Sequence, residues 1–411
     1  MNAKKYEIDT AENRTFLKEI SMELLEFGRK FPAPGGSAYY LKEDGTPWKE
    51  KNREVYETCR MAHVYAIGEF LGFKGGKELA EAAIRALWGE MRDKENGGWY
   101  AGLDAENAPL SGKLCYAHAF VILGASSAVL AGVDGAKELL GEAIKTYDRY
   151  FWNEAEGLSC DTWNTEFTVQ DDYRGLNANM HTVEAFLAAA DVLEDETYRV
   201  RAGRIIKNVV SWAEKNSWRI PEHYTKEWVP DLDCNRERPD DPFKPYGATP
   251  GHGLEWSRLI TQWALSAHKD RAAAPYVEAA KNLYHRAVSD GWNADGAPGV
   301  VYTTDWDGKP VVHDRMHWTL AEAINTAAVL YRVTGEAQYA ADYAEFMKYL
   351  DETVLDHENG SWFHQLDRNN QVAGTVWPGK PDLYHALQAC LIPYYAPEVS
   401  IALAVKRKQE V

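Results

Sequence analysis

Hydrophobic residues recur along the chain with the period of a helix, and short polar or Gly-rich stretches interrupt the pattern. This periodicity predicts twelve helices, over residues 11–28, 52–71, 77–92, 114–131, 135–151, 178–193, 196–215, 252–268, 273–290, 317–333, 336–352 and 382–391. Between alternate helices lie stretches rich in Gly, Trp, Asp and Asn, which are typical of short hairpins.

Polar, ring-bearing or ionisable residues open every second predicted helix in an otherwise apolar context. The six openings are centred on Arg60, Tyr116, His181, His252, Trp318 and His385. They follow one another at steps of 56, 65, 71, 66 and 67 residues, and such a step accommodates two helices and their connections. We therefore predict an all-α fold, an (α/α)6 barrel with the even-numbered helices inside and all six openings at one rim. A linear α-solenoid would instead spread the openings along a groove.

Two of the connecting segments resemble each other. Residues 96–104 and 359–367 share the pattern N-G-[GS]-W-[YF]-x-x-L-D, 263 residues apart, or about four helix-pair steps. A further hairpin is predicted at residues 299–309, where β-branched residues meet an Asp-Gly turn. We expect these short β-hairpins to lie in the loops on one face of the barrel.

Composition narrows the class of protein. The chain has 411 residues, 45% of them hydrophobic, and no linker-like tract, which favours a single domain over residues 1–411. A formal charge of −17 disfavours nucleic acid and anionic membranes as partners. The most apolar stretch, 117–133, is interrupted by small polar residues, and we interpret it as a buried helix rather than a membrane span. Five widely spaced cysteines and the absence of a signal-peptide pattern predict a cytoplasmic protein with free thiols. We expect the protein to be a monomer or a homodimer.

Candidate chemistry centres on two H-x-x-E pairs. His181 and Glu184 are three residues apart on one predicted helix, as are His252 and Glu255 on another, so each pair shares a helix face. Thr249 is a plausible N-cap before Pro250, which would place His252 at a helix N-terminus. Ordinary polar contacts or a metal site would also use these residue types. The sequence lacks H-E-x-x-H and clustered cysteines, so no metal is predicted.

Other polar and aromatic residues fall at equivalent positions of the repeat. Arg60 lies in an apolar stretch and needs acceptors, from a polyol or from an internal carboxylate. Trp318 and Trp377 are either packing residues or platforms for the apolar face of a sugar. Glu322, one turn after Trp318, is expected to bind hydroxyls or to brace the histidines.

At these residues the chain resembles the N-acylglucosamine 2-epimerase superfamily, whose members are (α/α)6 barrels that interconvert sugars without a metal. The resemblance is carried by N-A-N-M-H-T-V-E-A-F at 177–186, G-A-T-P-G-H-G-L-E-W at 247–256 and G-K-P-D-L-Y-H at 379–385. The last two motifs resemble those of its aldose–ketose isomerase branch, of the mannose isomerase type, related to sulfoquinovose isomerase. The resemblance implies catalytic roles for His252 and His385, no cofactor, and a monosaccharide substrate. It also implies substrate contacts by Arg60, Tyr116, Asn177, His181, Glu255, Trp318, Glu322 and Trp377.

The implied reaction is interconversion of D-mannose and D-fructose, with D-lyxose and D-xylulose as possible further substrates. His385 would carry the proton between C2 and C1 of a cis-enediol, and His252, oriented by Glu255, would assist ring opening. The alternatives are a mannose 2-epimerase, a sulfoquinovose isomerase, a glycoside hydrolase or a non-enzymatic sugar-binding protein. His364 and Pro381 replace glutamines that the resemblance associates with holding a sulfonate, which favours a neutral hexose. A hydrolase normally needs paired catalytic carboxylates, and the predicted rim is richer in histidine.

Overall fold

The computed structural model describes residues 3–267 and 274–411. Within these residues there are thirteen α-helices. They are α1 (Ala11–Phe27), α2 (Val55–Phe70), α3 (Gly76–Trp88), α4 (Cys115–Leu130), α5 (Ala136–Tyr150), α6 (Leu176–Leu193), α7 (Glu196–Lys215), α8 (Pro250–Ala267), α9 (Ala274–Gly291), α10 (His317–Thr334), α11 (Ala337–Tyr349), α12 (Tyr384–Leu391) and α13 (Ile401–Arg407). Residues 268 and 273, at the edges of two predicted helices, lie outside the described residues.

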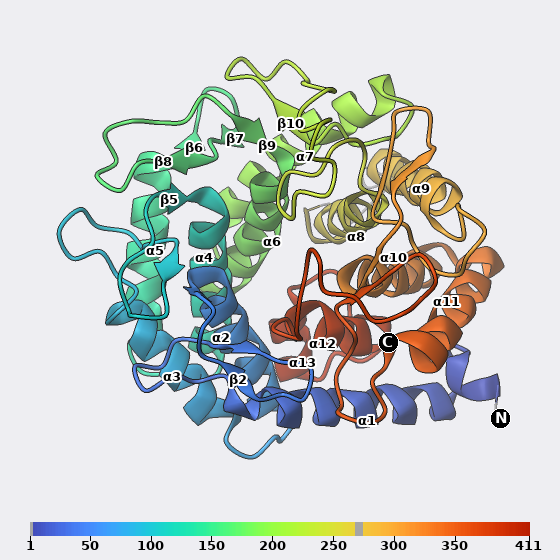
Figure 1. Cartoon of the computed structure of the whole chain (residues 1–411), viewed down its shortest axis with the longest axis horizontal. Coiled ribbons are helices and arrows are strands. Elements are labelled where there is room, and N and C mark those ends of the chain that lie inside the picture. The colour runs from blue at the N-terminus through green and yellow to red at the C-terminus, as the bar shows by residue number, and fades with distance from the viewer. Residues whose placement is uncertain (1–2, 268–273) are drawn as a thin grey trace.

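The even-numbered helices form a closed inner ring. Neighbouring contacts run from α2 to α4, α6, α8, α10 and α12, and α12 packs back against α2 (Figure 1). Each inner helix also packs on one outer helix: α2 on α3, α4 on α5, α6 on α7, α8 on α9, α10 on α11, and α12 on α1. The predicted (α/α)6 barrel is therefore confirmed, and closure of the ring excludes a linear solenoid.

Burial patterns explain which helices lie inside. In α4 nearly every residue from Cys115 to Ala128 is buried, because the helix is enclosed on all sides. In α5 the buried residues have the spacing of a single helix face, and they are Ala136, Leu139, Leu140, Ala143, Thr146 and Tyr147. The hydrophobic core therefore fills the space between the two rings, and the stretch interpreted above as a buried helix is one.

Small residues allow the inner helices to approach closely. A Cβ built on Gly124 of α4 would lie 2.8 Å from the carbonyl oxygen of Cys59 on α2, closer than real Cβ contacts come. Glycine at this position therefore lets two inner helices approach at backbone distance. None of the described helices is both long and apolar enough to cross a membrane.

Short two-stranded ladders tie the helix pairs together at one face. The strands are β1 (Tyr40–Leu41), β2 (Pro47–Trp48), β3 (Arg53–Glu54), β4 (Gly102–Leu103), β5 (Lys113–Leu114), β6 (Trp152–Asn153), β7 (Leu158–Ser159), β8 (Thr162–Trp163), β9 (Arg174–Gly175), β10 (His223–Tyr224), β11 (Thr303–Thr304), β12 (Pro310–Val312), β13 (Arg315–Met316) and β14 (Gln365–Leu366). All seven pairs are antiparallel: β1–β2, β3–β4, β5–β8, β6–β7, β9–β10, β11–β12 and β13–β14.

The ladders follow the helix repeat. Strands β3, β5, β9 and β13 each precede an inner helix, and each pairs with a strand that follows the next outer helix. These ladders lie at the N-terminal ends of the inner helices and so surround one end of the barrel (Figure 1). The hairpin predicted at 299–309 corresponds to β11 and β12.

The two segments with the shared pattern have equivalent local structure. Trp99 pairs with Arg92, and Trp362 pairs with Leu355, each in an isolated antiparallel β-bridge. In the first, the Asp93 carboxylate accepts from the backbone N–H of Asn96 and from Lys113 Nζ at 2.7 Å. In the second, Asp356 accepts from Asn359 and Lys380 in the same way. The repeated sequence pattern therefore marks a repeated structural brace.

Several boundaries differ from the predictions. The sequence pattern did not predict α13, a short helix that packs against α2 and α4. The helix predicted to begin at residue 382 begins at Tyr384, because the Asp382 side chain accepts from the Tyr384 backbone N–H at 2.7 Å and precedes the first turn. Thr249 occupies the predicted N-cap position before Pro250, where its carbonyl accepts from the backbone N–H of Gly253 at 3.1 Å, but its buried hydroxyl has no hydrogen-bond partner and so does not cap the helix.

Candidate active site

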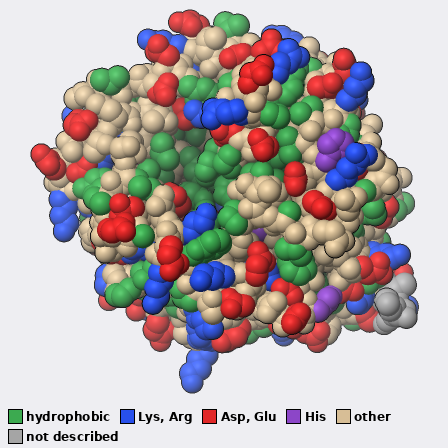
Figure 2. Space-filling model, in the orientation of Figure 1, with side chains coloured by type: hydrophobic (Ala, Val, Ile, Leu, Met, Phe, Trp, Pro, Cys, Tyr) green, Lys and Arg blue, Asp and Glu red, His purple; other side chains and the backbone are tan. Residues whose placement is uncertain are grey.

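The polar openings of the inner helices converge on one pocket. Its walls are formed by Glu57, Arg60, Tyr116, Asn177, His181, Pro242, Phe243, Pro245, His252, Glu255, Tyr302, His317, Trp318, His364, Trp377, Pro381, Asp382 and His385. The pocket contains about 590 Å³ of empty space, part of it open to solvent. Figure 2 shows hydrophobic side chains gathered around a depression near the middle of the face that bears the ladders.

His252 lies in the first turn of α8, as its position after Pro250 suggested. Its Nδ1 lies 3.0 Å from Oε1 of Glu222, on the segment that leads into β10. The indole of Trp318 packs against the other side of the imidazole, with ring centroids 5.0 Å apart. The expectation that Glu255 orients His252 is wrong, because Glu222 occupies that place and Glu255 is directed elsewhere.

His385 lies in the first turn of α12 and has a different glutamate partner. Its Nδ1 is 3.2 Å from Oε1 of Glu322 on α10. Trp318 also contacts this imidazole, with ring centroids 6.0 Å apart. Both histidines thus have a carboxylate near Nδ1, and both contact the indole of Trp318. The Nε2 atoms are the nitrogens that remain for a ligand in the pocket, and Nε2 of His385 lies 4.0 Å from the Asp382 carboxylate.

Glu322 does not line the pocket; it is fully buried behind His385. Its second oxygen accepts from Arg258 Nε at 2.7 Å. Although burial raises the pKa of a carboxyl, the guanidinium of Arg258 and the hydrogen bond from His385 hold the pKa of Glu322 below its usual range. Of the two roles expected for Glu322, the structure places it where it braces a histidine.

Arg258 connects three glutamates beneath the pocket floor. Besides Glu322, its guanidinium lies 3.4 Å from Glu255 and 3.9 Å from Glu184. Burial, followed by the negative charge of Glu322, raises the pKa of Glu255 well above its usual range. Burial also tends to raise the pKa of Glu184, but His181 and Arg258 together hold it well below its usual range.

His181 lies above this cluster, on α6. Its Nδ1 is 3.8 Å from Glu184 and 3.9 Å from Glu255, and its ring packs edge-to-face on Tyr116. Burial lowers the pKa of His181 to about 4, so the imidazole is neutral near pH 7 and can donate one N–H.

Arg60 is held in the wall of the pocket by aromatic rings and carboxylates. Its guanidinium donates to the Tyr116 hydroxyl at 3.0 Å and lies 3.6 Å from Glu57 and 3.5 Å from Asp382. Burial raises the pKa of Glu57 well above its usual range. Burial also tends to raise the pKa of Asp382. The positive charge of Arg60, and to a smaller extent His385, nevertheless holds this pKa well below its usual range.

Aromatic and imidazole rings form the remaining walls. Trp377 packs edge-to-face on Phe243, whose ring is 42% exposed and also contacts Tyr116. On the opposite side His317 stacks on His364 at 3.8 Å, and His317 Nε2 lies 3.2 Å from the Asp382 carboxylate. The pocket thus combines flat apolar surfaces with a few fixed donors and acceptors, which is the usual character of a small-molecule site.

Two groups of side chains have the residue types of a cation site. They are His181 with Glu184 and Glu255, and Glu255 with Glu322 and His385. Arg258 already contacts all three glutamates. Its charge supplies the compensation that these buried carboxylates would otherwise need from a bound ion.

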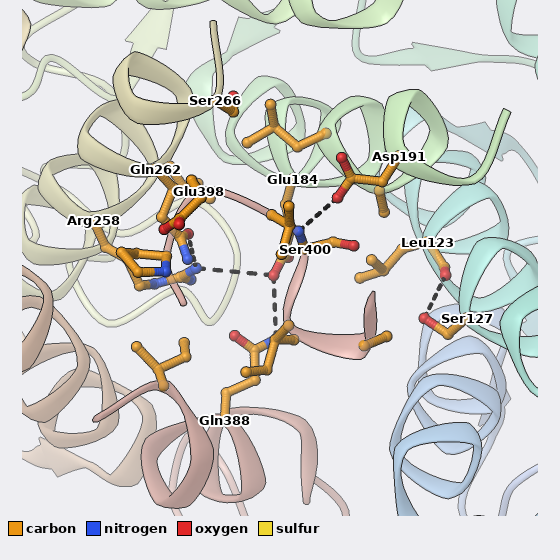
Figure 3. A pocket seen from close by; sticks show the side chains of 18 of the residues that line it. Leu123, Ser127, Glu184, Asp191, Arg258, Gln262, Ser266, Gln388, Glu398 and Ser400 are labelled. Atoms are coloured by element: carbon orange, nitrogen blue, oxygen red, sulfur yellow. Dashed lines mark hydrogen bonds and ion pairs between the residues drawn. The ribbon is translucent and has the colours of Figure 1, made fainter. Parts of the chain in front are cut away.

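A second cavity lies on the far side of Arg258 and shares this residue and Glu184 with the cluster (Figure 3). Gln388 donates to Glu184 at 3.1 Å, and Arg258 donates to Gln262 at 3.1 Å. The C-terminal segment 397–402 closes this cavity, with Ser400 donating from its backbone to Asp191. The charged cluster is therefore enclosed between two cavities rather than packed solidly on both sides.

Nine of the ten predicted site residues meet in the pocket described above: Arg60, Tyr116, Asn177, His181, His252, Glu255, Trp318, Trp377 and His385. Further wall residues were not predicted from the sequence, and they include Glu57, Asp382, Tyr302, Pro242, Phe243 and Pro245. Two of these had a detectable signal, since Glu57 lies one turn before Arg60 and Asp382 lies within the motif at 379–385. Arg258, one turn after Glu255, and Glu222 were also not predicted. No sequence pattern indicates a role for Glu222.

Comparison with known proteins identifies relatives along most of the chain. Residues 35–389 match the family model "N-acylglucosamine 2-epimerase (GlcNAc 2-epimerase)". A D-mannose isomerase from Pseudomonas cannabina pv. alisalensis is 42% identical, over 84% of this chain and 85% of the relative. A D-mannose isomerase from Thermobifida fusca is 39% identical, over 96% of this chain and 98% of the relative.

Solved structures agree with these relatives. A crystal structure of a D-mannose isomerase superposes with a TM-score of 0.85 at 27% identity and covers 92% of this chain and 97% of its own. A cellobiose 2-epimerase from Spirochaeta thermophila, at 18% identity and a TM-score of 0.78, shares the fold over 93% of this chain and 98% of its own. The prediction that this chain is an isomerase is confirmed. From Arg60 in α2 to His385 in α12, the chain belongs to the N-acylglucosamine 2-epimerase family.

Proposed function

We propose that this protein is an aldose–ketose isomerase that interconverts D-mannose and D-fructose. The observation that carries the proposal is the pair His252 and His385, which line one pocket and both contact Trp318, in a chain 39–42% identical to two D-mannose isomerases. We extend the proposal to D-lyxose and D-xylulose, which share with the hexoses the atoms that react. The enzyme would act in the cytoplasm as a monomer or homodimer.

The pocket suits a neutral sugar. Trp318 and Trp377 offer flat faces for C–H groups, while Arg60 and the amide of Asn177 offer donors for hydroxyl oxygens. Asp382, whose pKa lies well below its usual range, is a charged acceptor for sugar hydroxyls. The same negative charge would repel a sulfonate or phosphate, which favours a neutral hexose over sulfoquinovose.

Isomerisation begins with ring opening. The O1–H proton leaves, the C1–O5 bond breaks, and O5 gains a proton. We assign His252 to this exchange, because its Nδ1 faces Glu222 and its Nε2 is left for the substrate. An imidazole held in this way can accept one proton and return another without leaving its place.

The hydrogen then moves between C2 and C1. His385 removes the C2 proton to give a cis-enediol(ate), and returns it to C1 while the O2–H proton passes to O1, which leaves a carbonyl at C2. Glu322 fixes the Nδ1 of His385, so the same Nε2 can reach both carbons from one side. Arg60 and the neutral His181 stabilise negative charge that develops on O1 and O2.

A product survey tests the proposed activity. The purified protein is incubated separately with mannose, lyxose, glucose, fructose and sulfoquinovose, with and without a chelator, and products are identified by NMR. Fructose from mannose, unchanged by chelation, is the expected result. Glucose as the main product from mannose would show a 2-epimerase instead, and loss of activity with the chelator would show a metal requirement.

Substitution of the two histidines tests the assignment of roles. His252→Ala and His385→Ala should each lower kcat by about 10²–10⁴-fold, since general acid–base groups contribute on that scale. His285→Ala, on outer helix α9, serves as the control and should leave kcat unchanged. Turnover near the wild-type value in either pocket variant would refute its catalytic role.

A further inference from the structure

The carboxylate at His252 comes from a part of the chain that the sequence motifs do not mark. Glu222 lies between α7 and β10, thirty positions before His252, and its backbone carbonyl accepts from Leu176 at the start of α6. Its side chain is 3% exposed, and Oε1 lies 3.0 Å from His252 Nδ1. A buried carboxylate requires a donor or a positive charge nearby.

The surroundings of this carboxylate differ from those of the glutamate at His385. Glu322 is shared between His385 and the guanidinium of Arg258. Within residues 3–267 and 274–411, neither Glu222 Oε1 nor His252 Nδ1 has a hydrogen-bond partner of favourable geometry, the two buried atoms lie 3.0 Å apart, and no lysine or arginine lies within ion-pair distance of the carboxylate. A carboxylate is an acceptor, so the imidazole nitrogen that faces it must carry the hydrogen.

Two contacts therefore fix the His252 ring. Glu222 Oε1 lies 3.0 Å from Nδ1, and the indole of Trp318 packs on the ring with centroids 5.0 Å apart. We propose that Glu222 is a positioning residue that holds His252 as the Nδ1–H tautomer, with Nε2 directed to the substrate. This inference rests on the proposed role of His252 in ring opening.

The charge of Glu222 has a second effect. When His252 accepts a proton from the sugar O1–H, an imidazolium forms beside a carboxylate that no lysine or arginine of the described chain pairs with. Glu222 stabilises that imidazolium directly, whereas Glu322 shares its charge between His385 and Arg258. The two imidazoles thus differ in their surroundings, because the carboxylate beside His385 also pairs with Arg258 and the carboxylate beside His252 has no second cationic partner among the described residues.

Steady-state kinetics with matched variants test the proposal. Glu222→Gln keeps an acceptor but removes the charge, and Glu222→Ala removes both. We expect kcat to fall about 10-fold in the first and up to about 100-fold in the second, as for other residues that orient an active-site histidine, with KM changed less than about 3-fold. Glu227→Gln, an exposed glutamate five positions further on, is the control and should match the wild type.

A double-mutant cycle separates this inference from the proposed function. If Glu222 acts through His252, then Glu222→Gln combined with His252→Ala should be no slower than His252→Ala alone. Additive losses would overturn the positioning role while leaving the function intact. If His252→Ala alone has no effect, the proposed role of His252 fails instead. If mannose does not react, the ratios of variant to wild-type kcat are measured with whichever sugar the product survey shows to be converted.

The tautomer of His252 can also be measured directly in the wild-type protein. Nitrogen NMR of the wild-type protein labelled at histidine, with His252→Gln to assign the signal, should show hydrogen on Nδ1 and none on Nε2 of His252 near neutral pH. Hydrogen on Nε2 would overturn the proposal. Loss of the Nδ1–H signal in Glu222→Ala, with an unchanged melting temperature, would show that the effect is local.

Discussion

Arg258 offers the most direct test of how the charged cluster is held together. Its guanidinium is 1% exposed and contacts Glu322, Glu255 and Glu184, each itself buried. Arg258→Leu fills a similar volume but leaves these carboxylates without a counter-charge. Removing one partner of a buried ion pair costs about 3–5 kcal/mol, because an uncompensated buried charge remains.

This free energy converts into a melting temperature. Unfolding entropies of about 2.1 cal/mol/K per residue give a 411-residue chain about 0.9 kcal/mol/K near its midpoint. The variant should therefore melt about 4–6 °C below the wild type at pH 7.5. Arg29→Leu, which breaks an exposed pair with Glu26, is the control and should cost less than about 1 kcal/mol.

The deficit should also depend on pH. In the wild type the pKa values of Glu184 and Glu322 lie below their usual range, so both carboxylates contribute stability that is present above the unfolded value and lost as pH falls. Without Arg258, mainly His181 and His385 oppose the effect of burial, so both folded pKa values rise. The variant is then penalised most at high pH and least near pH 5.

Calorimetry of both variants and the wild type at pH 5.0, 6.5 and 7.5 gives the comparison. Equal melting temperatures of Arg258→Leu and the wild type at pH 7.5 would refute the reasoning. A deficit that is constant between pH 5.0 and 7.5 would show that lost packing, and not charge, is responsible.

Two further predictions concern glycine packing and acid stability. A Cβ at Gly251 would lie 2.6 Å from the Trp318 ring, so Gly251→Ala should displace the indole that contacts both histidines. We expect kcat/KM to fall by about 10–100-fold in steady-state kinetics. Gly141→Ala in α5 meets no atom within 4 Å and should keep full activity while adding about 0.5–1 kcal/mol of stability; equal activity of the two variants would refute the reasoning. Burial alone would raise the pKa of Asp93, but the Asn96 amide and Lys113 lower it to about 2. Asp93 thus contributes about 2 kcal/mol of stability that is present above pH ~4 and lost as pH falls through about 2. The melting-temperature difference between Asp93→Asn and the wild type should narrow from pH 7 toward pH 2, and a difference that is independent of pH would exclude this linkage.

Much of the fold could be predicted because each repeat has its own local signal. The step of about 65 residues reflects one inner helix, one outer helix and their ladder, so periodicity predicted six helix pairs, although it is also compatible with a linear α-solenoid. Helix α13 was not predicted because its apolar residues, from Ile401 to Val405, form a run too short to show a helical period. The start of α12 was misplaced because Asp382 reads as a helical residue until its side chain is seen to accept from Tyr384.

The candidate site was predictable where function and helix position coincide. His252 and His385 lie in the first turns of inner helices. Closure of the ring brings these first turns together, and this does not depend on the conformation of the loops. Glu222 and Phe243 lie on irregular segments whose course depends on tertiary packing, so no spacing rule relates them to the pocket. Glu322 was predicted, but its contact with Arg258 was not, since that contact joins two helices through residues 64 positions apart.

The way in which the ring closes has a consequence for biosynthesis. The sixth helix pair joins α1 to α12, segments separated by more than 350 residues, and His385 stands on the later one. While a ribosome is still making the chain, five pairs form an open arc whose end faces remain exposed to water. The catalytic chamber is completed only after α12 has emerged and docked against a helix made hundreds of residues earlier, so a nascent chain interrupted before that point has neither a sealed barrel nor its second imidazole.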